Sequence, residues 1–157
     1  MNPQHYILIF SSVAAVVLLF IFVPKSKVLD AHIIFLFMQA QAWLYGALVS
    51  EFRLIVYPVR LLERGDVSNI AFEYIVLPAI AVFYCLYFPI AKSMYFKNFY
   101  IVLYPTMITT LEVWLEKSTD LIVYTHWTWY WSWITLLITL NITLFYYRWF
   151  MEKVKIN

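Results

Sequence analysis

Five long apolar runs, separated by short polar segments, make up most of the chain. Each run has about 17 to 23 residues, the length that an α-helix needs to cross about 30 Å of hydrocarbon. We therefore predict an all-α fold, a polytopic membrane protein with a bundle of five transmembrane helices in a single domain, residues 1–157. The predicted helices cover about 6–23, 31–56, 70–91, 99–115 and 127–150.

The amino-acid composition indicates the same surroundings. Of the 157 residues, 64% are hydrophobic and 13% are charged, whereas a soluble domain has about 25% charged residues. So few charges would not cover a globule in water, and five helices leave no soluble domain over. The expected partner is the lipid bilayer. A net charge of +2 is too small to indicate a nucleic-acid partner.

The connection between the second and third runs is the longest, and it contains signals for a short helix. Pro58 suits the first turn of such a helix, and Gly65 suits the residue just past its end. Arg60 and Arg64 fall on one face between them. Two interpretations remain open: an interfacial helix with snorkelling arginines, or a site for anionic lipid headgroups at Arg60 and Arg64.

Basic residues in the loops predict the orientation in the membrane. With the N-terminus outside, the cytoplasmic side holds Lys25, Lys27, Lys92, Lys97, Arg148, Lys153 and Lys155. The outer side then holds fewer, namely Arg53, Arg60, Arg64 and Lys117. We predict an outer N-terminus and a cytoplasmic C-terminus, although the three arginines of the second loop favour the reverse.

The stretch THWTWYWSW, residues 125–133, has Trp at every second position. A period of two is typical of a strand, but the apolar run continues to 149 without a turn signal, and no other run alternates. On a helix, four such Trp side chains point in widely different directions and encircle the helix end. Because Trp and Tyr concentrate at the headgroup level, we predict an aromatic belt at the outer end of this helix.

Two of the predicted helices carry polar faces inside the membrane. Hydroxyl groups of the fifth helix share one face: Thr128, Ser132, Thr135, Thr139, Thr143 and Tyr146. The second helix has Gln39 at about mid-bilayer, where its amide needs a partner, and Gly46, which lets another backbone approach closely. We expect a polar seam among helices two to five. Contacts between helices are favoured over a substrate path as the reason for the hydroxyl face.

Three carboxylates are the main candidates for chemistry. Glu73 is near the start of the third helix, where the helix dipole favours negative charge. Glu112 and Glu116 share a face near the end of the fourth helix, where the dipole opposes them and like charges repel. Glu112 is one turn deeper, so it should be paired, protonated or next to a water-filled cavity. Arg53 and His126 are its candidate partners.

Motifs for other chemistry are missing from the sequence. Gly46 and Gly65 are the only glycines, so the chain has no P-loop, dinucleotide fingerprint or nucleophile elbow. Three scattered His and one Cys have no metal-binding spacing. We predict no metal site, and the sequence identifies no cofactor and no catalytic residue.

The stretch LEVWLEKSTDLIVYTHWTWYWSWITLLIT, residues 111–139, resembles part of an uncharacterised family of small five-helix integral membrane proteins of spore-forming Bacillus and Clostridium relatives. The resemblance covers about half of the chain and extends to residues 72–89, which are similar to the family's third helix. The matching features are Glu112 and Glu116, Thr119 to Tyr124, Trp127 to Tyr130, and Glu73 with Pro78. The resemblance implies five helices and a bacterial cytoplasmic (inner) membrane, but no activity.

Three hypotheses for function follow. In the first, the protein binds or carries a lipid or small molecule at the polar seam. The candidate ligand-binding residues are Glu112, Glu116, Glu73, Arg53, His126 and Gln39. In the second, it is a structural subunit of a membrane complex without a ligand of its own, and its partner is another membrane protein or a second copy. In the third, it is a lipid-active enzyme that uses Glu112 and Glu116 as acid and base; the missing motifs place it last.

Overall fold

The computed structural model describes residues 3–58 and 71–156, with side chains for 4–58 and 71–154. Its elements, in chain order, are α1 (Pro3–Phe22), the 3₁₀ turn η1 (Lys25–Lys27), α2 (Val28–Glu51), β1 (Ile55–Val56), the π-helical turn η2 (Phe72–Val76), α3 (Leu77–Leu86), α4 (Met94–Ser118), β2 (Val123–Tyr124) and α5 (Trp129–Ile156). The predicted all-α fold is confirmed, and two very short strands accompany the helices.

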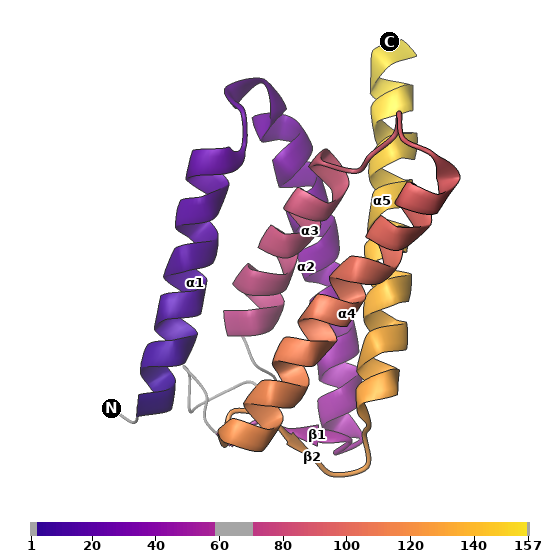
Figure 1. The fold of residues 1–157 in the computed structure, drawn as a ribbon. Helices are drawn as coiled ribbons and strands as arrows, with labels where there is room; N and C mark the ends of the chain where they lie inside the picture. Colours follow the sequence, from indigo (N-terminus) through magenta and orange to yellow (C-terminus); the bar gives the residue numbers. More distant parts are fainter. Residues whose placement is uncertain (1–2, 59–70, 157) are drawn as a thin grey trace.

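The helices run lengthwise beside one another as a bundle (Figure 1). α2 contacts both α3 and α5, α4 packs on α5, and α1 packs on η2 and α3. The start of α1 lies at the same end of the bundle as β1 and β2, whereas α5 ends at the opposite end. We refer to the first as the ribbon end and to the second as the C-terminal end.

The core lies where α2, α3 and α5 meet. Ile34, Met38, Val82 and Leu140 are each 0% exposed and belong to one cluster of buried side chains. In lipid there is little hydrophobic drive between helices, because the lipid tails are as apolar as the side chains. Close packing of these residues therefore contributes mainly dispersion energy.

The surface of the molecule is strongly apolar as well. Phe10, Phe20 and Phe145 are 75%, 84% and 74% exposed, and exposed apolar surface of this kind indicates apolar surroundings. Within residues 3–58 and 71–156, three segments are long and apolar enough to cross a membrane: Gln4–Phe22, Lys25–Glu51 and Trp129–Val154. Phe72–Leu86 is a shorter apolar helix. The length and composition of these helices are those of a membrane-embedded protein.

The second helix ends earlier than predicted. α2 stops at Glu51 rather than about 56, because Arg53 has a left-handed backbone with φ of 51° through which a helix does not continue. The chain then turns, and Ile55 pairs with Tyr124 in the antiparallel ribbon of β1 and β2. Arg53 therefore lies past the end of α2, although the predicted second helix, 31–56, included it.

The bounds of α3, α4 and α5 also differ from the prediction. α3 ends at Leu86 rather than about 91. The helix stops there because Phe88 precedes Pro89, and a residue before proline disfavours the helical conformation. α4 is longer than predicted at both ends. α5 begins at Trp129 rather than at Trp127, because the carbonyl of Thr128 accepts the first helical hydrogen bond, 3.0 Å from the amide of Trp131. The interfacial helix predicted near Arg60 and Arg64 lies outside the described residues.

The four alternating Trp residues divide into two groups. Trp129 and Trp131 are 59% and 47% exposed and form a surface aromatic cluster with Tyr130. Trp127 and Trp133 instead donate their indole N–H groups within the molecule. The Trp133 donor reaches Oγ1 of Thr106 on α4 at 3.0 Å. The predicted ring of four Trp around one helix end is therefore wrong for Trp127, which precedes the helix.

Candidate functional site

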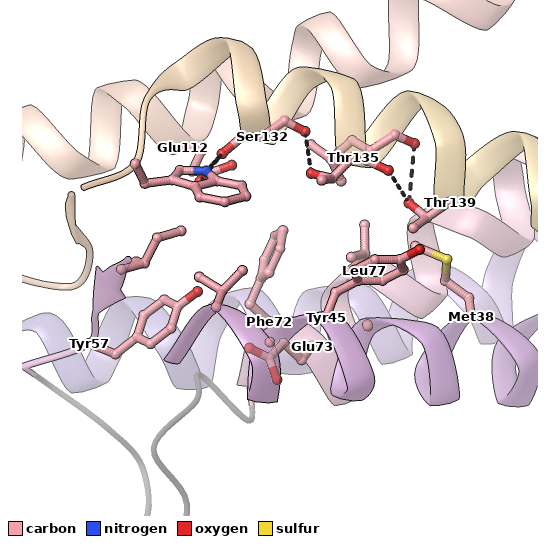
Figure 2. A pocket seen from close by; sticks show the side chains of 16 residues that line it. Met38, Tyr45, Tyr57, Phe72, Glu73, Leu77, Glu112, Ser132, Thr135 and Thr139 are labelled. Atoms are coloured by element: carbon pink, nitrogen blue, oxygen red, sulfur yellow. Dashed lines mark hydrogen bonds between the residues drawn. The ribbon is translucent and has the colours of Figure 1, made fainter. Parts of the chain in front are cut away.

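A cavity of about 100 Å³ lies between α2, η2–α3, α4 and α5, close to the ribbon end. Its lining residues come from these four helical segments and from the loops beside the ribbon (Figure 2). They are Met38, Ala42, Tyr45, Gly46, Val49, Ile55, Tyr57, Phe72, Glu73, Leu77, Glu112, Trp127, Ser132, Thr135, Leu136 and Thr139. The cavity is partly open to the surface and brings together two of the predicted carboxylates, Glu73 and Glu112.

Two hydroxyl groups hold the carboxylate of Glu112. Tyr124 donates to its Oε1 at 2.7 Å, and Ser132 donates to the same oxygen at 2.8 Å. The indole N–H of Trp127 in turn donates to the Ser132 hydroxyl at 2.8 Å. Both lengths are close to the commonest distance for O–H···O hydrogen bonds in proteins. The arrangement fixes the orientation of the Glu112 side chain beside α5.

The ribbon positions Tyr124 for this contact. Tyr124 pairs with Ile55 in the ladder, and Leu54 next to it accepts from the amides of Thr125 at 3.0 Å and His126 at 3.2 Å. Tyr124 lies outside the helices, and burial and then the charge of Glu112 raise its pKa well above the usual range. The phenol therefore stays protonated and able to donate at any physiological pH.

Glu73 lies on the α2 side of the same cavity (Figure 2). Its side chain is 4% exposed, and it belongs to the π-helical turn η2 that leads into α3. The Cα of Gly46 on α2 directly faces the carboxylate, so that a methyl group at this position would overlap it. Such π-helical turns are often found at functional sites. Gly46 does allow a close approach, but of the Glu73 side chain and not of another backbone, as the sequence had predicted.

Tyr57 adds a second phenol to the cavity from the loop after β1. Burial raises its pKa far above the usual value for tyrosine, and the nearby carboxylates of Glu73 and Glu112 raise it further. Like Tyr124, it remains a neutral phenol across the physiological pH range. The cavity thus combines two acids with neutral hydroxyl groups and apolar walls.

The predicted hydroxyl face of α5 points into the protein. Ser132, Thr139 and Thr143 are buried, and Thr135 and Thr139 line the cavity. Gln41 of α2 donates to Oγ1 of Thr143 at 2.8 Å, so this face both joins two helices and forms one wall of the cavity. The predicted contact between helices is therefore present at Thr143, while Thr135 and Thr139 face the cavity.

The other predicted site residues do not line the cavity. The amide of Gln39 donates to the carbonyl of Tyr74 at 3.0 Å and so joins α2 to η2. Glu116 is half-buried one turn beyond Glu112, whereas Arg53 and His126 are exposed. Within the described residues, neither Arg53 nor His126 pairs with Glu112; Tyr124 and Ser132 take that place.

Sequence reasoning missed several of these residues. The pairing of β1 with β2 brings three of them close to Glu112, and the apolar runs gave no sign of that pairing: Tyr57, Tyr124 and Trp127.

The sequence analysis also missed Asp30, at the C-terminal end of the bundle. Asp30 is 4% exposed and accepts from Lys27 and from Tyr147, both at 2.8 Å. The spacing of Lys27 and Asp30, three apart, was the available signal.

Comparisons with known proteins give no relative from which a role could be carried over: no family model, no curated protein and no solved structure matches the chain. In the part of the chain that the structure describes, no three His, Cys, Asp or Glu side chains gather closely enough to hold a metal ion. The geometry of the cavity is therefore the basis for a functional proposal.

Proposed function

We propose that the protein binds or carries a small molecule, or part of a lipid, in the cavity between α2, α3, α4 and α5. The observation that carries this proposal is the carboxylate of Glu112, which two hydroxyl donors hold inside a cavity with otherwise largely apolar walls. Ligand sites are typically concave and mostly apolar, with a few convergent polar groups that fix orientation. An acid at this depth is costly unless it has a function or a full set of partners.

Only two of the predicted ligand-binding residues, Glu112 and Glu73, line the cavity. Glu112 is its central polar group, and Glu73 contributes a second acid from the facing side. Gln39 acts in helix packing, and Glu116, Arg53 and His126 lie outside the cavity, so their part in binding is indirect. Anionic lipid at Arg60 and Arg64 remains a separate proposal for a segment outside the described residues.

The proposed setting is a bacterial cytoplasmic membrane, with the N-terminus outside and the C-terminus in the cytoplasm. Five passes through the membrane would place α3 and α4 across the bilayer together with the three long apolar segments. α1 begins at the ribbon end and α5 ends at the C-terminal end, and this arrangement supports an odd number of passes (Figure 1). The distribution of Lys and Arg supports the direction.

Native mass spectrometry of protein purified in mild detergent tests the proposal. We expect a defined lipid or metabolite to remain bound to the wild-type chain and to be lost from Glu112→Gln. Glu116→Gln is the matched control, because it makes the same change one turn away, outside the cavity, and should retain the ligand. If all three proteins carry only bulk lipid, the cavity is not a binding site, and the hypothesis of a structural subunit gains support.

A further inference from the structure

We propose that the cavity receives an organic ammonium group, and that the rest of the ligand extends through the open side. This inference rests on the proposed function and names the chemical class of its ligand. It follows from the charge, the hydrogen-bonding capacity, the aromatic rings and the size of the cavity.

Among the described lining residues, the charged groups have one sign. Glu73 and Glu112 both line the cavity, and its described lining includes no Lys, Arg or His. The phenols of Tyr57 and Tyr124 stay neutral, so they neither add nor compensate charge at physiological pH. An anionic group next to Glu112 would be repelled in a medium of low dielectric constant, whereas a cation would be attracted.

The carboxylate of Glu112 has a free direction for a donor. Both of its hydrogen bonds from described residues reach Oε1, so Oε2 is the oxygen left to accept from a ligand. An ammonium N–H supplies that donor, and its positive charge favours the ionised form of the carboxyl group. A hydroxyl group would supply the donor but leave the charge uncompensated.

Aromatic rings complete the surroundings that a cation prefers. Tyr45, Tyr57, Phe72 and Trp127 all line the cavity, and the hydrogen bond from Trp127 to Ser132 fixes the position of the indole. A cation close to the face of Trp, Tyr or Phe is attracted by the negative face of the ring. Carboxylates combined with several rings therefore favour an organic ammonium group over a hydrated metal ion.

The size of the cavity limits what enters. An apolar cavity of about 150 Å³ is enough to bind benzene, so a cavity of about 100 Å³ holds a group of only a few heavy atoms. A head group fits this space and a whole lipid does not. The open side, in a molecule with an apolar exterior, leaves room for an attached chain to reach the surface.

Three probes of nearly equal shape test the charge: pentylammonium, pentanol and pentanoate. The readout is the unfolding temperature of the purified chain in neutral detergent at pH 7. We expect pentylammonium at about ten times its Kd to raise this temperature by about 3–6 °C, and the other two probes to have much smaller effects. The shift should disappear in Glu112→Gln and remain in Glu116→Gln.

A second pair of variants covers the case in which Glu112→Gln does not fold. Thr135→Phe places a ring in the cavity, while Ile138→Phe adds the same bulk at a position of α5 that is 47% exposed. We expect only the first to abolish the shift. Equal shifts with pentanol, or a shift that survives in Glu112→Gln or in Thr135→Phe, would overturn the ammonium assignment.

The outcomes separate this inference from the proposed function. If pentanol stabilises the protein as well as pentylammonium does, and Thr135→Phe abolishes both effects, the cavity binds ligands but does not select a cation. If no probe changes the unfolding temperature and native mass spectrometry finds no ligand bound to the wild-type chain, both proposals fail.

Discussion

Glu112 shows how the chain accommodates a carboxylate among apolar side chains near the end of a helix. The helix dipole opposes a negative charge at that end, and the described residues provide no cation next to it. Tyr124 and Ser132 compensate with two short hydrogen bonds to one oxygen. The carboxylate is thereby held in place without a cation among the described residues, and the proposed ligand would supply one.

The contact between Tyr124 and Glu112 should have a measurable energy. Removing a hydrogen-bonding partner from an acceptor inside a protein costs about 1–3 kcal/mol, so Tyr124→Phe should lower the free energy of unfolding by that amount. In a Glu112→Leu background the same substitution should have little effect, because the acceptor is already gone. The free energy of unfolding in each background is measured by titration with a denaturing detergent in mixed micelles, with circular dichroism as the readout.

Tyr130→Phe is the control for this experiment. Its side chain is 45% exposed and lies in the surface aromatic cluster, so loss of its hydroxyl should change stability very little. Equal destabilisation by Tyr124→Phe in the two backgrounds would contradict the role given to this hydrogen bond.

For single residues, the sequence predicted which carboxylates lie inside the protein, but it did not predict which side chains bind them. Glu73 and Glu112 stand out because a carboxylate in an apolar run is rare and costly. Gln39 needed a partner for the same reason, and it has one in the carbonyl of Tyr74. Tyr57 and Tyr124 carried no such signal, because tyrosine is common at membrane interfaces and their approach to the carboxylates depends on the ribbon.

Among the elements, α2 and the η2–α3 segment approach each other most closely at Gly46. Gly46 faces the carboxylate of Glu73, and an added methyl group would overlap it. Gly46→Ala should therefore destabilise the protein by about 1–3 kcal/mol, the usual cost of overpacking. With Glu73→Ala already in place, the same change should be neutral or stabilising, because alanine is the better helix former. Unfolding in mixed micelles compares the two backgrounds, and an equal loss in both would count against this contact.

The ribbon of β1 and β2 is the element that links α2 to α5 beside the cavity. Val56 and Val123 are direct partners in it, and side chains opposite one another in an antiparallel pair are close enough for a disulfide. Cysteines at both positions, in a Cys85→Ala background, should cross-link readily under mild oxidation. Electrophoresis after labelling of free thiols detects the bond.

The matched control pairs Val56→Cys with Val28→Cys, at the start of α2. Val28 lies at the opposite end of that helix from the ribbon, so no bond should form within one chain. If both pairs cross-linked to a similar extent, or neither did, the register of the ribbon would be wrong.

The sequence predicted the helices better than the ribbon for a physical reason. Long apolar runs specify helices, because in lipid the backbone has to satisfy its own hydrogen bonds. Strands of two residues, such as Ile55–Val56, are too short to show a period. The left-handed Arg53 that ends α2 had no glycine or asparagine to mark it, so the turn into β1 was read as further helix.

On the scale of the whole molecule, the ends of the chain lie at opposite ends of the bundle (Figure 1). The cavity is closer to the ribbon end, together with the start of α1 and the loop that contains Thr125. The C-terminal end of the bundle contains η1, the buried Asp30 and the last turns of α5. Under the proposed orientation, the cavity therefore lies toward the outer side of the membrane.

Thiol labelling in whole cells tests this orientation and the number of passes together. In a Cys85→Ala background, Thr125→Cys should react with a membrane-impermeant maleimide on intact cells, because Thr125 is exposed at the ribbon end. Lys25→Cys, exposed in η1 at the other end, should react only after the membrane is permeabilised. The opposite pattern would reverse the orientation and place the cavity on the cytoplasmic side. Labelling of both positions in intact cells would contradict a bundle that spans the membrane, because its two ends would then face the same compartment.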